Sequence, residues 1–288
     1  MIAHVAEASE DKGRVVVRLG EFAMSSPAAI SAAIHVATAF RSQLEGLFIE
    51  DPDLYNACTH ANLREVAMTG RAPALLSPIK LGRDAEAFAV AVQRQLSNAA
   101  SAAGVRFTAR VVRETPIKAL QDACAERGPW NIIVFAEPIE GRERGAFVSD
   151  TIAQVWGTTG YIATGARAAW RAGPIIVAIE DVGHLTGMIR AAERLAAVAG
   201  DEIQLIPVGI DEIGLDWLEG EIRLTLGEGS SVAVLPRPVY AGSSLVLHAA
   251  ISAYRPRMVI ARHGGFLLPS GETAKPLAGL GCPVFMVH

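Results

Sequence analysis

The sequence predicts an α/β fold made of two tandem, doubly wound parallel-sheet domains, each with the element order βαβαβαβαβ. Short runs of apolar residues recur along the chain, as is typical of strands buried on both faces of a parallel sheet. Apolar residues at helical spacing fill the segments between these runs, so strands alternate with helices. The pattern also occurs twice, because residues 15–17 (VVV) correspond to residues 175–177 (IIV).

The first domain is expected to span residues 1–165. Its expected strands are 14–19, 43–50, 105–113, 130–136 and 160–164, and its expected helices are 28–40, 84–103, 116–126 and 149–156. Ser26 and Pro27 are typical of a helix start, and Gly104 of a helix end. Residues 137–147 are expected to form a charged loop. Residues 51–79 hold too many apolar side chains for a solvated linker, so we expect an inserted flap that packs on the sheet.

A short linker, residues 165–173, leads to the second domain, which is expected to span residues 174–288. Its expected strands are 174–180, 202–210, 231–235, 258–260 and 284–287, and its expected helices are 185–199, 216–226, 243–254 and a short one that begins near 271 with Ser270 as its cap. This half lacks the flap and has a shorter second helix. A repeat of this size implies an internal pseudo-twofold axis, with the halves packed edge to edge or helix to helix.

Composition narrows the classes of protein. Hydrophobic residues make up 51% of the 288 residues and charged residues 19%, which predicts a large core. The net charge of -4 and the lack of a basic run argue against nucleic acid as a partner. Three widely spaced cysteines favour a reducing compartment over a disulfide framework or a zinc site. Neither a signal peptide nor a membrane span of about 18–20 apolar residues is evident, so we expect a cytoplasmic protein without a membrane partner.

The best candidate site is the glycine-containing loop that follows the strand at 258–260. Gly264 and Gly265 free the backbone and expose its N–H groups, and a helix is expected to begin soon afterwards. Open parallel sheets bind anionic ligands between the carboxyl end of a strand and the start of the next helix. The alternative is a plain βαβ connection in which the glycines serve tight packing.

The element order, the acidic end of the strand in IIVAIED (175–181) and the terminal CPVFMV (282–287) resemble the universal stress protein family in its tandem form. The resemblance implies a Rossmann-like, adenine nucleotide alpha hydrolase-like fold. Members of that family that bind ATP have an Asp at the end of the first strand and a G-x-x-G-x9-G-[ST] loop after the fourth. Here Glu180 replaces the Asp, and alanine replaces the first glycine at position 261. Only five residues separate Gly264 from Ser270, so the loop is about four residues short.

The resemblance places any nucleotide contacts in the second half. They are Ile179, Glu180, Asp181, Ala261, His263, Gly264, Gly265, Ser270 and Gly271. The first half departs further from the family, because Leu19 and Gly20 replace the acidic residue and the carboxylates of Glu137, Glu140 and Glu143 would repel phosphate.

Other chemistry is sparse. The motifs of P-loops, dinucleotide-binding turns, nucleophile elbows and zinc proteases are absent. His35 and His248 lie within expected helices and are expected to be structural, whereas His263 is the best polar contact for a ligand. Residues 51–53 (DPD) would either bind a cation or cap the following helix, and we favour the cap.

These observations favour a non-enzymatic, universal-stress-like regulatory or binding protein without a catalytic site, a metal or an assigned cofactor. We expect a homodimer with a small-molecule or protein partner. Two alternatives stay open: an ATP- or AMP-binding protein that uses Glu180 and the loop at 261–271, and a small-molecule enzyme with a pocket under the flap at 51–79.

Overall fold

The computed structural model describes residues 13–20, 25–59, 64–65, 74–75, 77–126, 130–227, 232–234, 239–240, 244–270 and 274–287. The elements of the first half are β1 (Arg14–Leu19), α1 (Pro27–Ala39), β2 (Gln43–Glu50), α2 (Pro52–Ala57), β3 (Arg64–Glu65), β4 (Ala74–Leu75), α3 (Pro78–Ala102), β5 (Phe107–Arg113), α4 (Pro116–Ala125), β6 (Asn131–Phe135), α5 (Gly141–Gln154) and β7 (Thr158–Ala163). Those of the second half are β8 (Ile175–Ile179), α6 (Leu185–Ala199), β9 (Ile203–Gly209), α7 (Glu212–Leu226), β10 (Ala233–Val234), β11 (Val239–Tyr240), α8 (Ser244–Ala253), β12 (Met258–Arg262), α9 (Ala274–Leu280) and β13 (Val284–Val287).

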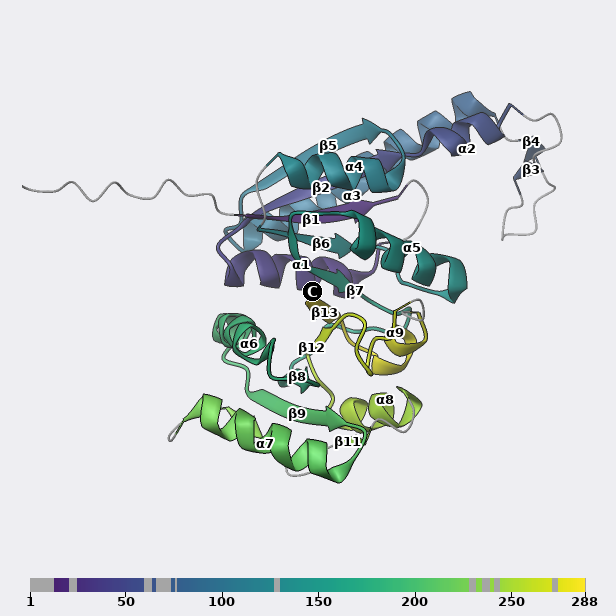
Figure 1. Cartoon of the computed structure of the whole chain (residues 1–288). Coiled ribbons are helices and arrows are strands. Elements are labelled where there is room, and N and C mark those ends of the chain that lie inside the picture. The colour runs from purple at the N-terminus through teal and green to yellow at the C-terminus, as the bar shows by residue number, and fades with distance from the viewer. Residues whose placement is uncertain are drawn as a thin grey trace, which may run out of the picture.

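One large sheet runs through both halves (Figure 1), in the order β10-β9-β8-β12-β13-β7-β6-β1-β2-β5. Within each half the strands of this large sheet are parallel, and β11 continues the pairing of β10 along β9. The halves meet where β7 and β13 pair antiparallel, with Val287 opposite Gly160 and Val284 opposite Ala163. The halves therefore join edge to edge, which is one of the two arrangements that the repeat predicts.

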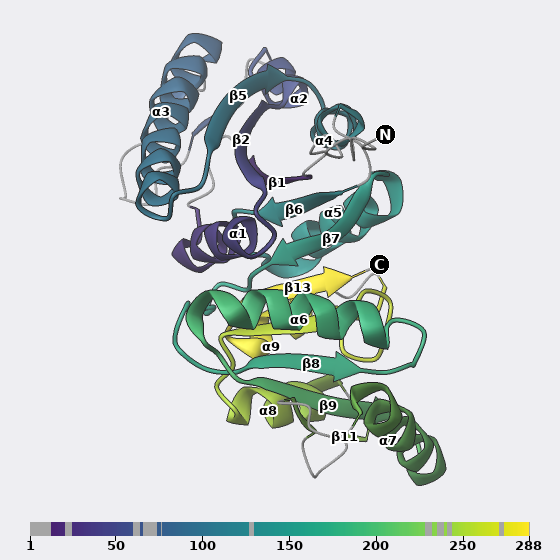
Figure 2. The same cartoon turned by 90° about the vertical axis from the view of Figure 1, so that its left-hand side faces the viewer.

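Helices cover both faces of this sheet. The core on one face contains residues of α1, α3, α6 and α7, and the core on the other contains residues of α4, α5, α8 and α9. Figure 2 looks onto the face where α1 and α6 lie on either side of the β7–β13 seam. Along β1, Val15 and Val17 point into the first core and Val16 into the second, so the apolar strand is buried on both sides.

The pseudo-twofold axis passes between α1 and α6. The imidazole Nε2 of His35 on α1 lies 2.9 Å from the backbone oxygen of Leu195 on α6, and these residues are 160 positions apart, the same offset that relates β1 to β8. Trp170, from the connection between the halves, packs edge-on against His35 at 5.1 Å between ring centroids. The guanidinium of Arg257 lies over the same indole and forms an ion pair with Asp201 at 2.7 Å.

Three helices begin earlier than the sequence predicts, because glycines near their starts (Gly82, Gly141, Gly145 and Gly214) lower the helix propensity there. α3 starts at Pro78 rather than at 84, since proline fits a first helical turn. α7 starts at Glu212 rather than at 216, and the carboxylate of Asp211 caps it by accepting the N–H of Gly214 at 2.7 Å. α5 starts at Gly141 rather than at 149, so most of the expected charged loop at 137–147 is helical, with Glu143 and Arg144 exposed to solvent.

The flap behaves differently from the expectation in its described part. α2 contains no buried residue, and the β3–β4 hairpin pairs only with itself and lies beyond α2, away from the sheet (Figure 1). The side chain of Asp51 accepts the N–H of Asp53 at 3.0 Å, so this acidic turn caps α2. Among the flap residues whose side chains the structure describes, Cys58 alone is buried, so this part of the flap covers little of the sheet. The ring of Tyr55 packs under Arg113 at the end of β5, 4.6 Å from the guanidinium carbon.

Candidate functional site

Each half of the sheet has one point where the direction of strand addition reverses. In the first half it lies between β1 and β6, and in the second between β8 and β12. The loops after these neighbouring strands diverge and leave a crevice, which is the usual ligand site of an open α/β sheet. Both crevices are therefore candidate sites, and the predicted residues lie in the second.

The carboxylate of Glu180, directly after β8, bridges the second crevice. Its Oε2 accepts the N–H of Phe266 at 2.7 Å, and its Oε1 accepts the N–H of Leu267 at 3.0 Å. These two N–H groups belong to the loop after β12 that the sequence suggests for an anion. Burial raises the pKa of Glu180 above its ordinary value, although the two N–H donors and the charge of Arg262 act in the opposite direction. A carboxylate of the protein itself therefore accepts both of these N–H groups.

Gly264 and Gly265 make this contact possible. Gly264 has a φ of +80°, a conformation that favours glycine, and its N–H closes the loop onto the oxygen of Leu268 at 2.8 Å. A Cβ on Gly265 would lie only 1.9 Å from Oε2 of Glu180, so the carboxylate fits because this residue has no side chain. Leu267 and Leu268 are fully buried and anchor the loop in the hydrophobic core.

Asp181 forms a second polar cluster in the same crevice. Its carboxylate accepts a hydrogen bond from Nδ1 of His184 at 2.9 Å and another from the guanidinium of Arg262 at 2.7 Å. Burial raises the pKa of Asp181, but the hydrogen bond and charge of His184 and the charge of Arg262 outweigh this effect and leave the pKa below its ordinary value. The cation of Arg262 is therefore already paired with a carboxylate.

The structure brings together most of the predicted site residues. Glu180, Asp181, Gly264 and Gly265 line a shallow hollow of about 380 Å³. The remaining predicted residues lie around it: Ile179 and Ala261 are buried in β8 and β12, His263 is half-buried just after β12, Ser270 is exposed, and Gly271 falls outside the described residues. The expected helix cap at Ser270 also leads into residues that the structure does not describe.

The first crevice is also bridged by a carboxylate, but here the carboxylate follows β6 and reaches the loop after β1. In the second crevice the carboxylate follows β8 and reaches the loop after β12. Glu137, after β6, accepts the N–H of Gly20 and pairs with Arg18 at 2.7 Å. Its side chain is only 5% exposed, and the Arg18 guanidinium also stacks over Phe147 at 4.7 Å. Glu137 was expected only to repel phosphate, whereas it also occupies the backbone donor and the cation of this crevice.

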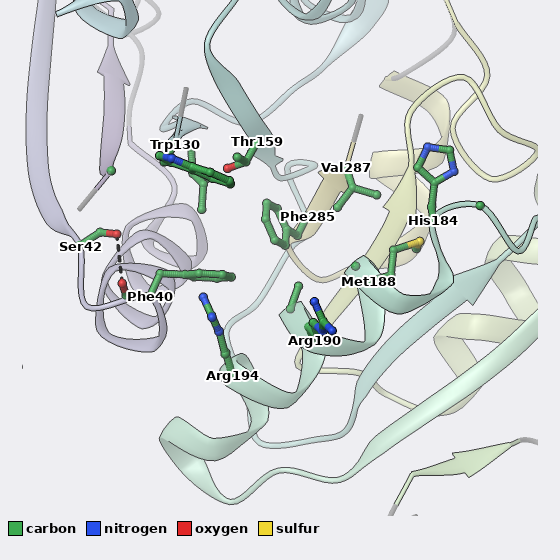
Figure 3. Close-up of a pocket in the computed structure, with 15 residues that line it drawn as sticks. Phe40, Ser42, Trp130, Thr159, His184, Met188, Arg190, Arg194, Phe285 and Val287 are labelled. Carbon is green, nitrogen blue, oxygen red and sulfur yellow. Dashed lines mark hydrogen bonds between the residues drawn. The ribbon is translucent and has the colours of Figure 1, made fainter. Parts of the chain in front are cut away.

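A third hollow, which the sequence did not suggest, lies over the seam on the α1–α6 face (Figure 3). Its volume is about 620 Å³. Arg190 and Arg194 rise into it from α6, with Phe285 of β13 between them and the indole of Trp130 (Figure 3). Phe40 packs against Phe285 and under Arg194, with its ring centroid 5.5 Å from the guanidinium carbon. Residues from both halves form this cavity because the antiparallel seam places the start of β7 beside the end of β13, and the start of β6 is the next strand along.

The cysteines and His248 lie in the interior of the described part of the chain. The three cysteines are free and buried, and burial raises the pKa of Cys124 and of Cys282 to about 12. His248 is 2% exposed, with Nε2 3.5 Å from the oxygen of Leu267. No cluster of three potential metal ligands occurs among the residues that the structure describes.

No helix in the described part of the chain is long and apolar enough to cross a membrane. No protein-family model matches the chain, and no curated protein matches it in sequence. Solved structures do match. They include a universal stress protein from Archaeoglobus fulgidus DSM 4304, which is 12% identical with a TM-score of 0.58 and covers 94% of this chain and 97% of its own.

Two further structures share the arrangement. A protein from Pseudomonas aeruginosa UCBPP-PA14, assigned to the universal stress proteins, is 11% identical with a TM-score of 0.56 over 96% of this chain and 94% of its own. The cytoplasmic domain of a prokaryotic cation chloride cotransporter is 9% identical with a TM-score of 0.53 over 96% and 95%. The chain therefore has the tandem α/β fold of universal stress proteins, as the sequence suggests, and at these identities the likeness concerns the fold.

Proposed function

We propose that this chain is a non-enzymatic, universal-stress-like binding or regulatory protein whose switch-point crevices do not bind ATP at micromolar concentration. The observation that carries this proposal is the pair of hydrogen bonds from Phe266 and Leu267 to Glu180. Triphosphate recognition in such a crevice needs backbone N–H groups that are free to donate. Here both donors already face a carboxylate of the same chain.

The cost of displacing that carboxylate is large. A charge-assisted hydrogen bond contributes about 1.5–3 kcal/mol, so losing two of them weakens binding by roughly a hundredfold or more. A phosphate that entered would also approach the negative charges of Glu180 and Asp181. The first crevice has the same difficulty, because Glu137 already pairs with Gly20 N–H and Arg18.

The absence of catalysis is part of the proposal. The hollow beside the flap, about 740 Å³, is lined by Glu50, Tyr55, Arg83, Glu86, Gln93 and Arg113 together with apolar and small residues, and no serine, cysteine, histidine or lysine is among the described residues that line it. Without a serine or cysteine nucleophile beside a histidine or lysine base, an enzyme under the flap has little support. The fold itself does not decide the question, because one fold serves many functions.

Assembly as a homodimer remains part of the proposal. Light scattering coupled to size-exclusion chromatography measures it directly, and a mass of twice 30.4 kDa is expected. A mass of one chain at micromolar concentration would remove the dimer from the proposal without touching the rest.

Calorimetric titration of ATP and of AMP into the full chain tests the central claim. We expect no saturable binding in the micromolar range. One-to-one micromolar binding that is lost in Gly264→Val would overturn the proposal and favour the nucleotide-binding alternative. Binding that survives Gly264→Val would overturn it as well, and would place the nucleotide outside the loop after β12.

A further inference from the structure

We propose that the cavity over the β7–β13 seam is a binding site for a small planar aromatic compound that carries an anionic group, a carboxylate or a phosphate. This site is separate from the loop after β12 and does not depend on whether ATP binds there. Its volume of about 620 Å³ suits a small organic ligand, since such sites typically measure about 300–1,000 Å³.

The charge of the cavity selects an anion. None of its fifteen lining residues is acidic, whereas Arg190 and Arg194 both reach into it (Figure 3). Among the described residues, no carboxylate lies within ion-pair distance of either guanidinium, although the protein as a whole has a net charge of -4. Arginine is suited to carboxylate and phosphate because its planar fork donates two parallel hydrogen bonds.

The repeat indicates that the fold does not require these two arginines. The positions 160 residues earlier on α1 are Ile30 and Ile34, and Ile30 is buried in the core while Ile34 packs against it. At the other end of the seam the equivalent helix face is therefore apolar. The arginines distinguish one end of the seam from the other, as expected for a site rather than for a structural need.

The aromatic walls select a planar ring. Trp130 is 61% exposed although it is a large apolar side chain, and its indole lies across the cavity from the arginines (Figure 3). Phe40 and Phe285 meet edge to face, with centroids 6.5 Å apart, and form the wall between them. Phe285 is only 2% exposed, so a ring that enters the cavity would bury mainly the solvent-facing indole of Trp130. Ser42 and Thr159 also line the cavity. Their hydroxyl groups donate to the backbone oxygens of Phe40 and Asn131, so they can accept hydrogen bonds from polar substituents.

Gly187 provides a way to close the cavity without damaging the fold. It lies in the first turns of α6 and lines the cavity, and a Cβ added there meets no atom within 4 Å. Phenylalanine at this position would project into the space while increasing helix propensity relative to glycine. Gly220 on α7 is a matched control, because it is also helical and open but lies outside the cavity.

The experiment uses calorimetry with the full chain and four probes that separate ring from charge. They are 2-naphthoate, 2-naphthyl phosphate, 2-naphthol and inorganic phosphate. We expect at least one naphthyl anion to bind one-to-one, and the neutral naphthol and the free phosphate to bind at least about tenfold more weakly, as loss of one charge-assisted contact predicts. The stronger of the two naphthyl anions identifies the preferred anionic group.

Variants locate the binding. Arg190→Gln and Arg194→Gln should each weaken binding of the naphthyl anion by about tenfold or more. Arg94→Gln on α3, which changes an exposed arginine outside the cavity, should leave the affinity unchanged. Gly187→Phe should abolish binding without lowering the unfolding temperature, and Gly220→Phe should leave binding unchanged.

Three outcomes would overturn the proposal. The first is that neither naphthyl anion binds the folded chain at millimolar concentration. The second is that binding survives Gly187→Phe. The third is that 2-naphthol binds as tightly as 2-naphthoate, since the arginines would then play no part.

Discussion

Replacing Gly265 with alanine is expected to break the bridge between Glu180 and the loop after β12. The new Cβ would lie 1.9 Å from Oε2 and 2.6 Å from the carboxyl carbon of Glu180. The carboxylate must then retreat by roughly 1.5 Å to reach the 3.4 Å of an ordinary contact, which removes the hydrogen bonds from Phe266 and Leu267.

The magnitude follows from those two bonds. Each charge-assisted bond contributes about 1.5–3 kcal/mol, and solvent recovers part of the loss because the loop is open on one side, so we expect the free energy of unfolding to fall by about 2–4 kcal/mol. Gly265 itself has no left-handed φ, so alanine adds no backbone strain there.

Urea denaturation of a double-mutant cycle isolates the contact. In a Glu180→Ala background the carboxylate is absent, and Gly265→Ala should change the free energy of unfolding by less than about 0.5 kcal/mol. Gly220→Ala, in open space on α7, is the control and should stabilise the chain slightly. An equal cost of Gly265→Ala in both backgrounds would refute the reasoning, because the alanine would then act on something other than Glu180.

Three further predictions concern the crevice, the axis and the seam. Glu180→Ala should let the chain bind inorganic phosphate at least about tenfold more tightly than wild type, because two N–H donors become free; calorimetry showing no gain would contradict this. Burial lowers the pKa of His35 below 6.5, despite its hydrogen bond to Leu195, so the unfolded state takes up this proton first as the pH falls. Stability should therefore decrease as the pH falls from about 6.5 toward the lower folded pKa, and denaturation curves of His35→Gln should lack that part of the decrease. Gly160→Val should lower the free energy of unfolding by about 2 kcal/mol or more, since a Cβ there would lie 2.4 Å from the ring of Phe285; a loss below about 0.5 kcal/mol in urea would show that the seam yields easily.

Element order and type could be predicted well, because the signals are local. α6 has the bounds that the sequence predicts, since its apolar spacing is regular and Gly200, with a φ of +68°, ends it. The starts of α3, α5 and α7 are harder to predict because glycines stand in their early residues, which argues against a helix on local propensity. Such starts become helical because the rest of the helix packs on the sheet, which a local pattern does not contain.

The sites were harder to predict because they depend on distant contacts. The loop after β12 was found from its glycines, but the hydrogen bond from Phe266 to Glu180 joins residues 86 positions apart. The seam cavity draws on Phe40, Trp130 and Phe285, which no local pattern relates. One signal was available: the two helices that the repeat pairs carry isoleucines in one copy and arginines in the other.

The connection at residues 165–173 passes only one end of the seam. There Trp170 packs against His35 and Arg257, so side chains of the connection close that end, while the end near Trp130 stays hollow. Two identical chains related by a true twofold axis would carry the same residues at both ends, and every substitution would appear twice. Covalent duplication removes that restriction. One end of the seam can keep its packing while the side chains at the other end change independently. We therefore expect one seam ligand per chain.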